Sequence, residues 1–381
     1  MFPEVRASQE IRSILNTALD GQRLTVEEGV QLLRASSRDT MAIALTADEV
    51  RSSKVGEEVS YVVNRNINFT NICVGSCQFC AFRRREGEKG AYFLDIPQIV
   101  EKTQEARDLG ATEICIQGGL HPEIDVHFYS DLISAVKDNG NSIHLHAFSP
   151  MEIHYMSKQS DMNIGETLKL LKKSGLDSMP GTAAEILDDG IRSRICPQKI
   201  KSDEWVSIVK EAHGHGIPTT ATMLYGHVES PEQKLDHLSV LRSIQDETKG
   251  FTEFVPLSFI HYNTPLFKSG KSRPGATGME DLRALSVARL FLDNFRNIQS
   301  SWVKLGRKLA QLMLNFGAND LGGTLMEENI SKAAGREVGT MTKEALEQII
   351  LDAGKTPVQR DTLYRPVLEH KAENLKSLQK I

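Results

Sequence analysis

The spacing of apolar residues along the chain changes near residue 60. Between residues 8 and 55 apolar positions recur at helical spacing, as in IRSILNTAL and VEEGVQLLRAS. Thr25 is followed three residues later by Glu28, which is the pattern of a capping box. These residues predict a helical N-terminal extension. From about residue 60, short β-branched or apolar runs alternate with amphipathic segments of helical length.

Eight of the short runs are candidate strands. In chain order they are SYVVNRNINFT, TEICIQGG, SIHLHAF, LDSMPG, IPTTATML, FTEFVPLS, NIQSSWV and NFGANDL. Several of the helical segments between them, such as GETLKLLKKSG, end in glycine, as helix C-termini commonly do. The alternation predicts an α/β fold of the (β/α)8 TIM-barrel type. A doubly wound open sheet is the alternative.

The pattern changes again after Leu321, where it becomes helical and polar and ends in the charged segment LEHKAENLKSLQKI. We therefore divide the chain into three parts. Residues 1–55 form the helical extension, residues 56–322 form the barrel, and residues 323–381 form a C-terminal extension that packs on the barrel.

Composition narrows the class of protein. The chain has 381 residues, of which 40% are hydrophobic and 25% charged, as is ordinary for a soluble globular protein. A net charge of -5 without a run of basic residues argues against a nucleic-acid partner. No apolar run approaches the ~20 residues that span a membrane. Five cysteines, an odd and unevenly spaced set, do not form a disulfide framework, so we expect a cytoplasmic protein with reduced thiols.

Three of the five cysteines lie in the stretch NICVGSCQFCAF. Cys73, Cys77 and Cys80 follow the first candidate strand and therefore belong to the carboxyl end of a barrel, where barrel enzymes place their chemistry. A structural zinc site needs a fourth ligand, and Cys115 and Cys196 are distant and poorly placed to supply it. An iron–sulfur cube with three protein ligands and one open iron fits better. Zinc binding or simple electron transfer remains an alternative.

The Cys-x3-Cys-x2-Cys spacing after a first barrel strand resembles the radical S-adenosylmethionine (SAM) enzymes. This resemblance implies a 4Fe–4S cluster whose open iron binds SAM, and cleavage of SAM to methionine and a 5′-deoxyadenosyl radical. It also implies that Phe79 lies against the adenine of SAM, and that Gln117, Gly118 and Gly119 contact its methionine moiety. The family commonly has Glu after the glycine pair. Leu120 stands there in this chain, so the contact to the amino group of SAM stays unassigned.

Further polar residues follow other candidate strands. His144 and His146 share one strand face, and we predict a chamber role for His146 and cofactor binding for Ser149. Relatives use polar residues after the fourth strand to hold SAM, which makes Thr182 and Glu185 candidates, although Ala-Ala-Glu could also simply open a helix there. The remaining chamber candidates follow the sixth strand or lie at the last, and they are His261, Tyr262, Asn263, Asn319 and Asp320.

Longer stretches resemble one family within this group, the tyrosine-using subunits of FO synthase. They include HLHAFSPMEI, LDSMPGTAAEILDD, PTTATMLYGHVE, FTEFVPLSFIHYNTPLF and GANDLGGTLMEENISKAAG, within a match from about residue 60 to Tyr364. The resemblance implies a radical SAM transferase that cleaves the Cα–Cβ bond of L-tyrosine. The 4-hydroxybenzyl group is added to 5-amino-6-(D-ribitylamino)uracil, and 2-iminoacetate is released.

That reaction implies partners and leaves alternatives. It needs an external one-electron reductant, and a second radical SAM enzyme, FO synthase subunit 1, completes the deazaflavin chromophore of coenzyme F-420. Since only one set of three cysteines is present, the chain is not the fused form that carries both reactions. The alternatives are cyclic dehypoxanthine futalosine synthase of menaquinone biosynthesis and a non-catalytic iron–sulfur protein. DSMPGTAAEIL together with FTEFVPL favours the tyrosine-using family.

Overall fold

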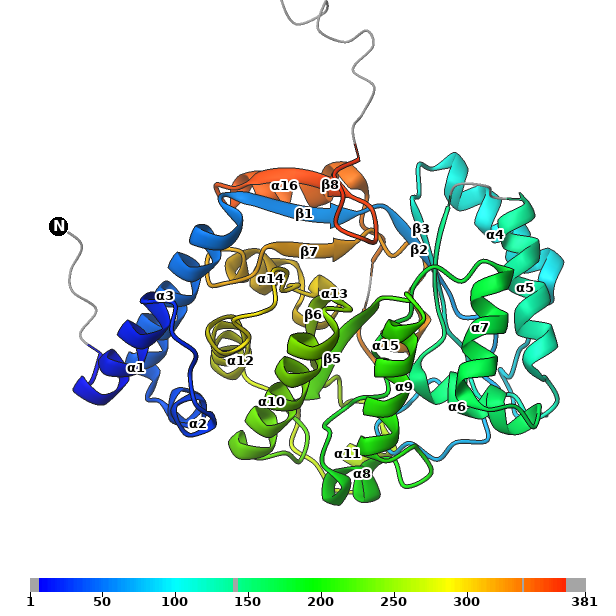
Figure 1. Cartoon of the computed structure of the whole chain (residues 1–381), viewed down its shortest axis with the longest axis horizontal. Coiled ribbons are helices and arrows are strands. Elements are labelled where there is room, and N and C mark those ends of the chain that lie inside the picture. Colours follow the sequence, from blue (N-terminus) through cyan, green and yellow to red (C-terminus); the bar gives the residue numbers. More distant parts are fainter. Residues whose placement is uncertain (1–6, 140–142, 338, 368–381) are drawn as a thin grey trace, which may run out of the picture.

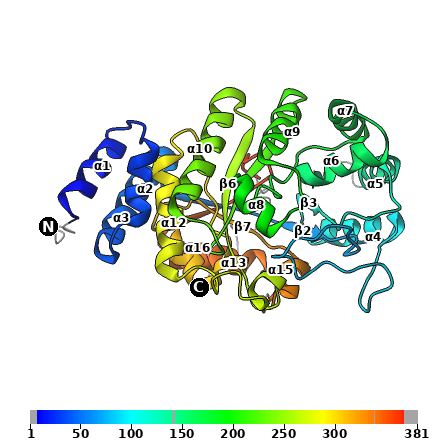
Figure 2. The same cartoon turned by 90° about the horizontal axis from the view of Figure 1, so that it is seen from below.

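The computed structural model describes residues 7–139, 143–337 and 339–367. Three helices come first, α1 (Gln9–Leu19), α2 (Val26–Arg34) and α3 (Ser37–Val55). The predicted capping box at the start of α2 is confirmed, because the Glu28 N–H donates to Thr25 Oγ1 at 3.2 Å and the Thr25 N–H donates to Glu28 Oε2 at 2.8 Å. These helices lie at one end of the molecule, and α3 packs on α12 (Gly278–Phe291) (Figures 1 and 2).

Parallel strands form the centre of the molecule. They are β1 (Glu58–Val62), β2 (Asn64–Ile67), β3 (Glu113–Ile116), β4 (His144–Ala147), β5 (Thr219–Tyr225), β6 (Phe251–Ser258) and β7 (Asp320–Gly323). Only Val63 separates β1 from β2, so together they make the first barrel strand. β2 pairs with β3, β3 pairs with β4, and β5 pairs with β6.

Two of the predicted strands, within 176–181 and 297–303, appear only as single bridges. His146 pairs with Ser178 and Met179 with Thr219, which joins β4 to β5. Phe254 pairs with Ile298 and Gln299 with Asp320, which joins β6 to β7, and β7 returns to β1 through Ser60 and Asp320. The ring of eight strand positions is therefore closed. The predicted (β/α)8 barrel is confirmed, and the open-sheet alternative is wrong.

Helices cover the outside of this ring (Figure 1). They are α4 (Ile96–Asp108), α5 (Val126–Asn139), α6 (Pro150–Gln159), α7 (Ile164–Ser174), α8 (Asp189–Ile195), α9 (Ser202–Gly214), α10 (Pro231–Thr248), α11 (Pro265–Lys268) and α14 (Arg307–Met313). The short helix α13 (Trp302–Leu305) directly follows the strand position around Ile298. Local sequence sets many of their ends. Asp95 caps α4 in a capping box, and α7 ends at Gly175, whose φ of 118° suits glycine.

The C-terminal part contains α15 (Asn329–Ala333), α16 (Lys343–Asp352) and one further strand, β8 (Thr356–Arg360). The prediction that this part is helical is wrong at β8, which pairs in parallel with β1. The buried residue of β8 is Arg360, whose Nε donates to Asp320 Oδ2 at 2.6 Å. Because a charged residue fills the buried position, the segment lacks the apolar pattern that marks a strand. The charged segment 368–381 lies outside the described residues.

The helices of the described part include none long and apolar enough to cross a membrane.

Candidate active site

The carboxyl ends of the barrel strands surround a cavity of about 430 Å³. This chamber has two sides. The cofactor side carries most of the residues predicted from motifs, namely Cys73, Cys77, Phe79, Cys80, Gln117, Gly118, Gly119, Ser149, Thr182 and Glu185, and all ten line the cavity. The late-strand side comes from the end of β6 and from later segments, and it carries Ser258, Gln299, Ser301, Lys304, Glu328 and Ser331.

The cysteine loop is anchored through its main chain. The Cys73 N–H donates to the Arg84 carbonyl at 3.0 Å, the Val74 N–H to the Leu120 carbonyl at 3.0 Å, and the Gln78 N–H to the Ile195 carbonyl at 2.7 Å. Arginine side chains also hold the loop, since Arg83 Nη1 donates to the Gly75 carbonyl at 3.0 Å and Arg85 Nη1 to the Cys73 carbonyl at 2.7 Å. The three thiols are free and partly exposed.

This loop fits an iron–sulfur cube. In the described part of the chain, no three Cys, His, Asp or Glu side chains are placed to hold one metal ion. A four-iron cube does not need three side chains that converge on one metal ion, because each cysteine binds a different iron at a separate corner. Three free thiols in one anchored loop, facing a cavity with room for a non-protein ligand, match that requirement.

The glycine pair after β3 packs against the start of the cysteine loop. A Cβ on Gly119 would stand 2.2 Å from the Ile72 carbonyl oxygen, and a Cβ on Gly118 would stand 2.4 Å from the Phe69 ring. Larger residues would therefore push the first strand away from the second. The pair fixes the position of the cysteine loop as well as lining the chamber.

Glu152 is a buried chamber residue that the sequence analysis missed. Its Oε1 accepts from the Gly118 N–H at 3.1 Å, and its Oε2 accepts from the Ser149 N–H and Oγ, both at 2.7 Å. Burial raises the pKa of Glu152, and these hydrogen bonds oppose the shift. Ser149 caps α6 and so acts in a capping box with Glu152. The S-P-M-E pattern after the histidine strand could have revealed this pair.

Glu185 forms a second buried interaction on the same side. Its Oε1 lies 2.6 Å from Lys199 Nζ, which also stands 5.2 Å from the centre of the Phe79 ring. Burial of most of its side chain opposes the charge of Lys199, yet the neighbouring carboxylate of Glu185 raises its pKa. The helix-opening alternative for Glu185 is wrong, because its φ of 49° belongs to a left-handed turn and α8 begins only at Asp189. Thr182 accepts from Gln117 Nε2 at 3.4 Å.

His146 lies in the barrel wall and does not line the cavity. Its Nδ1 and the Nε2 of His144 both lie 2.7 Å from the Ser178 hydroxyl. Burial lowers the pKa of His146 to about 4. The ring is therefore held uncharged in a hydrogen-bonded wall position, apart from the chamber predicted for it.

Asn319 and Asp320 lie at the amino end of β7, because the strand begins rather than ends there. Asn319 Oδ1 accepts from Arg289 Nη2 at 2.6 Å, and Asp320 Oδ2 accepts from Ser60 Oγ at 2.6 Å as well as from Arg360. The prediction that they line the barrel mouth is wrong, since the cysteine loop is at the opposite end of the strands.

His261, Tyr262 and Asn263 lie after β6 but outside the cavity. Tyr262 is 60% exposed, with its ring 4.1 Å from that of His261. Asn263 Nδ2 donates to the Ala333 carbonyl at 3.0 Å. The prediction that these three residues line the chamber is wrong, and Asn263 instead contacts the end of α15.

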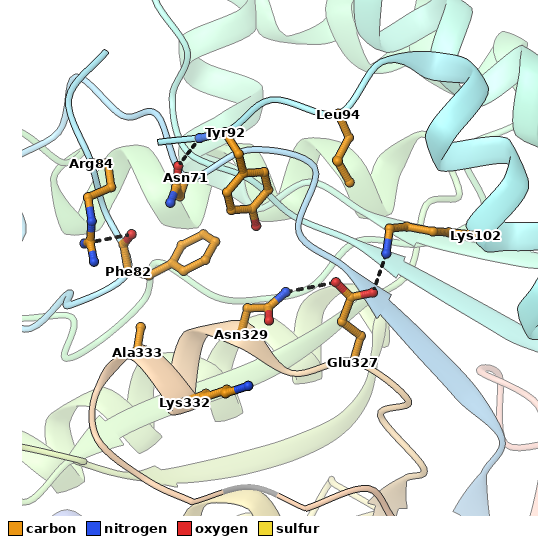
Figure 3. A pocket seen from close by; sticks show the side chains of 10 residues that line it. All are labelled: Asn71, Phe82, Arg84, Tyr92, Leu94, Lys102, Glu327, Asn329, Lys332 and Ala333. Atoms are coloured by element: carbon orange, nitrogen blue, oxygen red, sulfur yellow. Dashed lines mark hydrogen bonds and ion pairs between the residues drawn. The ribbon is translucent and has the colours of Figure 1, made fainter. Parts of the chain in front are cut away.

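A second pocket, also of about 430 Å³, lies on the outer side of α15 (Figure 3). Glu327 binds Lys102 Nζ at 2.9 Å and Asn329 Nδ2 at 3.0 Å, which ties α4 to the start of α15. Lys332 and Ala333 face this outer pocket, whereas Ile330, Ser331 and Ala334 face the chamber. Helix α15 is thus a wall between the two cavities.

Family models match almost all of the barrel. The model described as the radical SAM superfamily matches residues 67–241, which contain the cysteine loop and the glycine pair. The model described as the CofH/MqnC C-terminal region matches residues 248–372. The fold and the site therefore define a radical SAM enzyme, which uses a 4Fe–4S cluster and SAM.

Curated relatives identify the family within that class. A protein of Methanothermobacter thermautotrophicus is 49% identical over 93% of this chain and 97% of its own length. One of Methanocaldococcus jannaschii is 54% identical over 84% of this chain and 90% of its own. Both are named 5-amino-6-(D-ribitylamino)uracil--L-tyrosine 4-hydroxyphenyl transferase, and this chain belongs to their family.

Solved structures support the fold alone. Methylornithine synthase is 18% identical, with a TM-score of 0.72 over 90% of this chain and 97% of its own. The FeFe-hydrogenase maturase HydG of Carboxydothermus hydrogenoformans is 15% identical, also with a TM-score of 0.72, over 94% of this chain and 81% of its own.

Proposed function

We propose that this protein is the tyrosine-using enzyme of deazaflavin biosynthesis. It cleaves the Cα–Cβ bond of L-tyrosine, transfers the 4-hydroxybenzyl group to 5-amino-6-(D-ribitylamino)uracil and releases 2-iminoacetate. One observation carries this proposal, namely the identity of 49% and 54% to transferases of that name over most of both chains. The C-terminal family model alone does not separate this reaction from that of futalosine-using relatives, because its description covers both groups.

We assign the cluster to Cys73, Cys77 and Cys80, and SAM to the residues beside them on the cofactor side. When bound, the cluster and SAM supply a 5′-deoxyadenosyl radical that abstracts hydrogen from tyrosine. Phe79 offers a flat face to the adenine, and the glycine pair lets SAM approach the main chain closely. Gln117, Ser149, Thr182 and Glu185 complete this side. The fact that all of these residues line one cavity supports the assignment.

The chain's own contribution to the chemistry is enclosure and orientation. A carbon radical attacks almost any nearby C–H bond, so the substrate must be held close and water excluded. The barrel wall and α15 enclose the chamber, and Glu152 holds the glycine turn through the Gly118 N–H. Removing an acceptor from a buried N–H leaves that group unsatisfied, so Glu152 is a positioning residue for this turn.

The proposal includes partners that complete the pathway. An external one-electron reductant supplies the cluster, and FO synthase subunit 1, a second radical SAM enzyme, consumes the product. We place the reaction in the cytoplasm. The five free cysteines of the structure support this compartment, because reduced thiols persist there.

The test is an anaerobic incubation of the reduced enzyme with SAM, tyrosine and the ribitylaminouracil, followed by mass spectrometry. We expect 5′-deoxyadenosine and a hydroxybenzyl adduct of the uracil. A parallel mixture holds dehypoxanthine futalosine and SAM, and we expect no cyclised product from it. Turnover in the second mixture only would assign the protein to menaquinone biosynthesis.

A further inference from the structure

The late-strand side of the chamber contains an amino group without a carboxylate partner. Lys304 extends from α13, and its Nζ donates to Ser331 Oγ at 2.7 Å. In the part of the chain that the structure describes, Lys304 forms no ion pair. Burial lowers the pKa of Lys304, and the more distant Glu328 carboxylate opposes this shift. On the cofactor side, by contrast, Lys199 is neutralised by Glu185 at 2.6 Å.

Two more polar groups converge on Lys304 in the chamber. Ser331 is 1% exposed, and its hydroxyl accepts from Lys304, so its own proton is available to another acceptor. Glu328 Oε2 accepts from the Ser331 N–H at 2.8 Å, and among the described residues its Oε1 has no hydrogen bond. All three residues line the cavity. The chamber therefore presents one cation, one hydroxyl and one carboxylate oxygen, which are linked through hydrogen bonds to Ser331.

This set of groups is complementary to a free amino acid. A buried cation is costly unless a negative group pairs with it. A ligand carboxylate would pair with Lys304 and accept from Ser331, and a ligand ammonium would pair with Glu328. Charge-assisted contacts of this kind are the strongest hydrogen bonds in a binding site.

Resting on the function proposed above, we propose that Lys304 and Ser331 bind the carboxylate of tyrosine and that Glu328 binds its ammonium group. SAM also carries a carboxylate and an ammonium. We assign the site to tyrosine because Lys304, Glu328 and Ser331 come from segments after β6, whereas the cluster ligands and the residues assigned to SAM come from segments between β2 and α8. Separate measurements of tyrosine binding and SAM binding distinguish which of the two ligands occupies this site.

The test is equilibrium dialysis of the unreduced holoenzyme, which binds its ligands without turning them over. Three labelled ligands are compared in the presence of SAM. They are tyrosine, tyramine, which lacks the carboxylate of tyrosine, and 3-(4-hydroxyphenyl)propionate, which lacks its ammonium group. Lys304→Met should weaken tyrosine about 10- to 100-fold and leave tyramine unchanged. Glu328→Gln should weaken tyrosine and leave the propionate unchanged. Lys304→Arg should retain part of the affinity, because it keeps the charge.

Lys332→Met is the matched control, because Lys332 is a neighbouring lysine on α15 that faces the outer pocket of Figure 3. It should change none of the affinities, and the affinity of Lys304→Met for SAM should equal that of the parent protein. If Lys304→Met keeps the preference for tyrosine over tyramine, the proposed site is wrong. If it loses affinity for SAM instead, Lys304 serves the SAM carboxylate, which also overturns the proposal. Failure of the unmodified holoenzyme to bind tyrosine at all would instead overturn the proposed function.

Discussion

The two sides of the chamber are built in different ways. The cofactor side comes from short segments whose main chain is fixed in place, such as the loop at 73–84 and the turn at 117–120. On the late-strand side, Lys304, Glu328 and Ser331 come from α13 and the start of α15, and they are held by each other. A site made of main chain requires a local pattern of cysteines and glycines, whereas a site made of scattered side chains leaves no such pattern. The first was visible in the sequence and the second was not.

The two chamber lysines show the same contrast in charge. Lys199 is part of a closed pair with Glu185, and Lys304 has only a hydroxyl at hydrogen-bond distance. The closed pair is complete without a ligand and serves to shape the site. Lys304 gains a carboxylate partner only when a ligand binds in the chamber.

Replacing Cys73, Cys77 or Cys80 by alanine should abolish cluster binding, because each thiol is expected to hold a separate iron. Cys115→Ala and Cys196→Ala are the controls, since Cys115 lies within β3 and Cys196 follows α8, and neither lines the cavity. Iron content after anaerobic reconstitution measures the effect. Loss of iron in either control variant would show that the ligand assignment is wrong.

Lys199→Met should lower the free energy of unfolding by about 3 kcal/mol, because it leaves the buried carboxylate of Glu185 without its partner. Lys304→Met should change it by less than about 1 kcal/mol, because no ion pair is broken. Anaerobic urea unfolding compares the two. The double variant Lys199→Met/Glu185→Gln should recover much of the loss. Equal losses for the two single variants would remove the distinction between a closed pair and an open cation.

His146 should make the fold sensitive to acid without contributing to ligand binding. Its pKa is about 4 in the folded chain, whereas the unfolded value is about 6.5, so the unfolded chain binds the proton more readily. The stability that the uncharged His146 contributes to the fold is therefore complete above about pH 6.5 and decreases as the pH falls toward 4. Between about pH 7.5 and about pH 5, protonation of His146 in the unfolded chain should lower the free energy of unfolding by about 2 kcal/mol. Over the same pH range, the free energy of unfolding of His146→Gln should therefore fall by about 2 kcal/mol less than that of the parent protein. Urea unfolding at both pH values measures this difference. A weaker affinity of His146→Gln for tyrosine would instead place His146 in the chamber.

Ser149→Ala should lower the free energy of unfolding by about 1 kcal/mol, because it removes the cap of α6 and one hydrogen bond to Glu152. SAM affinity should fall only several-fold, because Glu152 keeps its bond to the Gly118 N–H. Ser149→Thr keeps the hydroxyl and serves as the control. A loss of SAM affinity of about 100-fold at unchanged stability would indicate direct contact between Ser149 and SAM.

The fold was predicted where elements carry an apolar pattern, and missed where they do not. All eight predicted strands occupy barrel positions, although the runs around Ser178 and Ile298 form only single bridges. β8 was missed because its buried residue is Arg360. The Ala-Ala-Glu run after Thr182 forms a turn rather than a helix, since Ala183 and Glu185 have left-handed backbone conformations that composition does not signal.

Residue order alone determined the ligand-bearing loop, the glycine turn and the alternation of strands and helices. In each case the cause is local, because spacing along the chain fixes which face or loop a residue occupies. Only the tertiary structure decided which polar residues reach the chamber. Asn319 and Asp320 lie at the wrong end of β7 because the strand starts there, and His146 lies in the wall because Ser178 binds it. Lys304, Glu328 and Ser331 meet because α13 and α15 pack over the same barrel mouth, and a contact between separate segments depends on that packing rather than on local spacing.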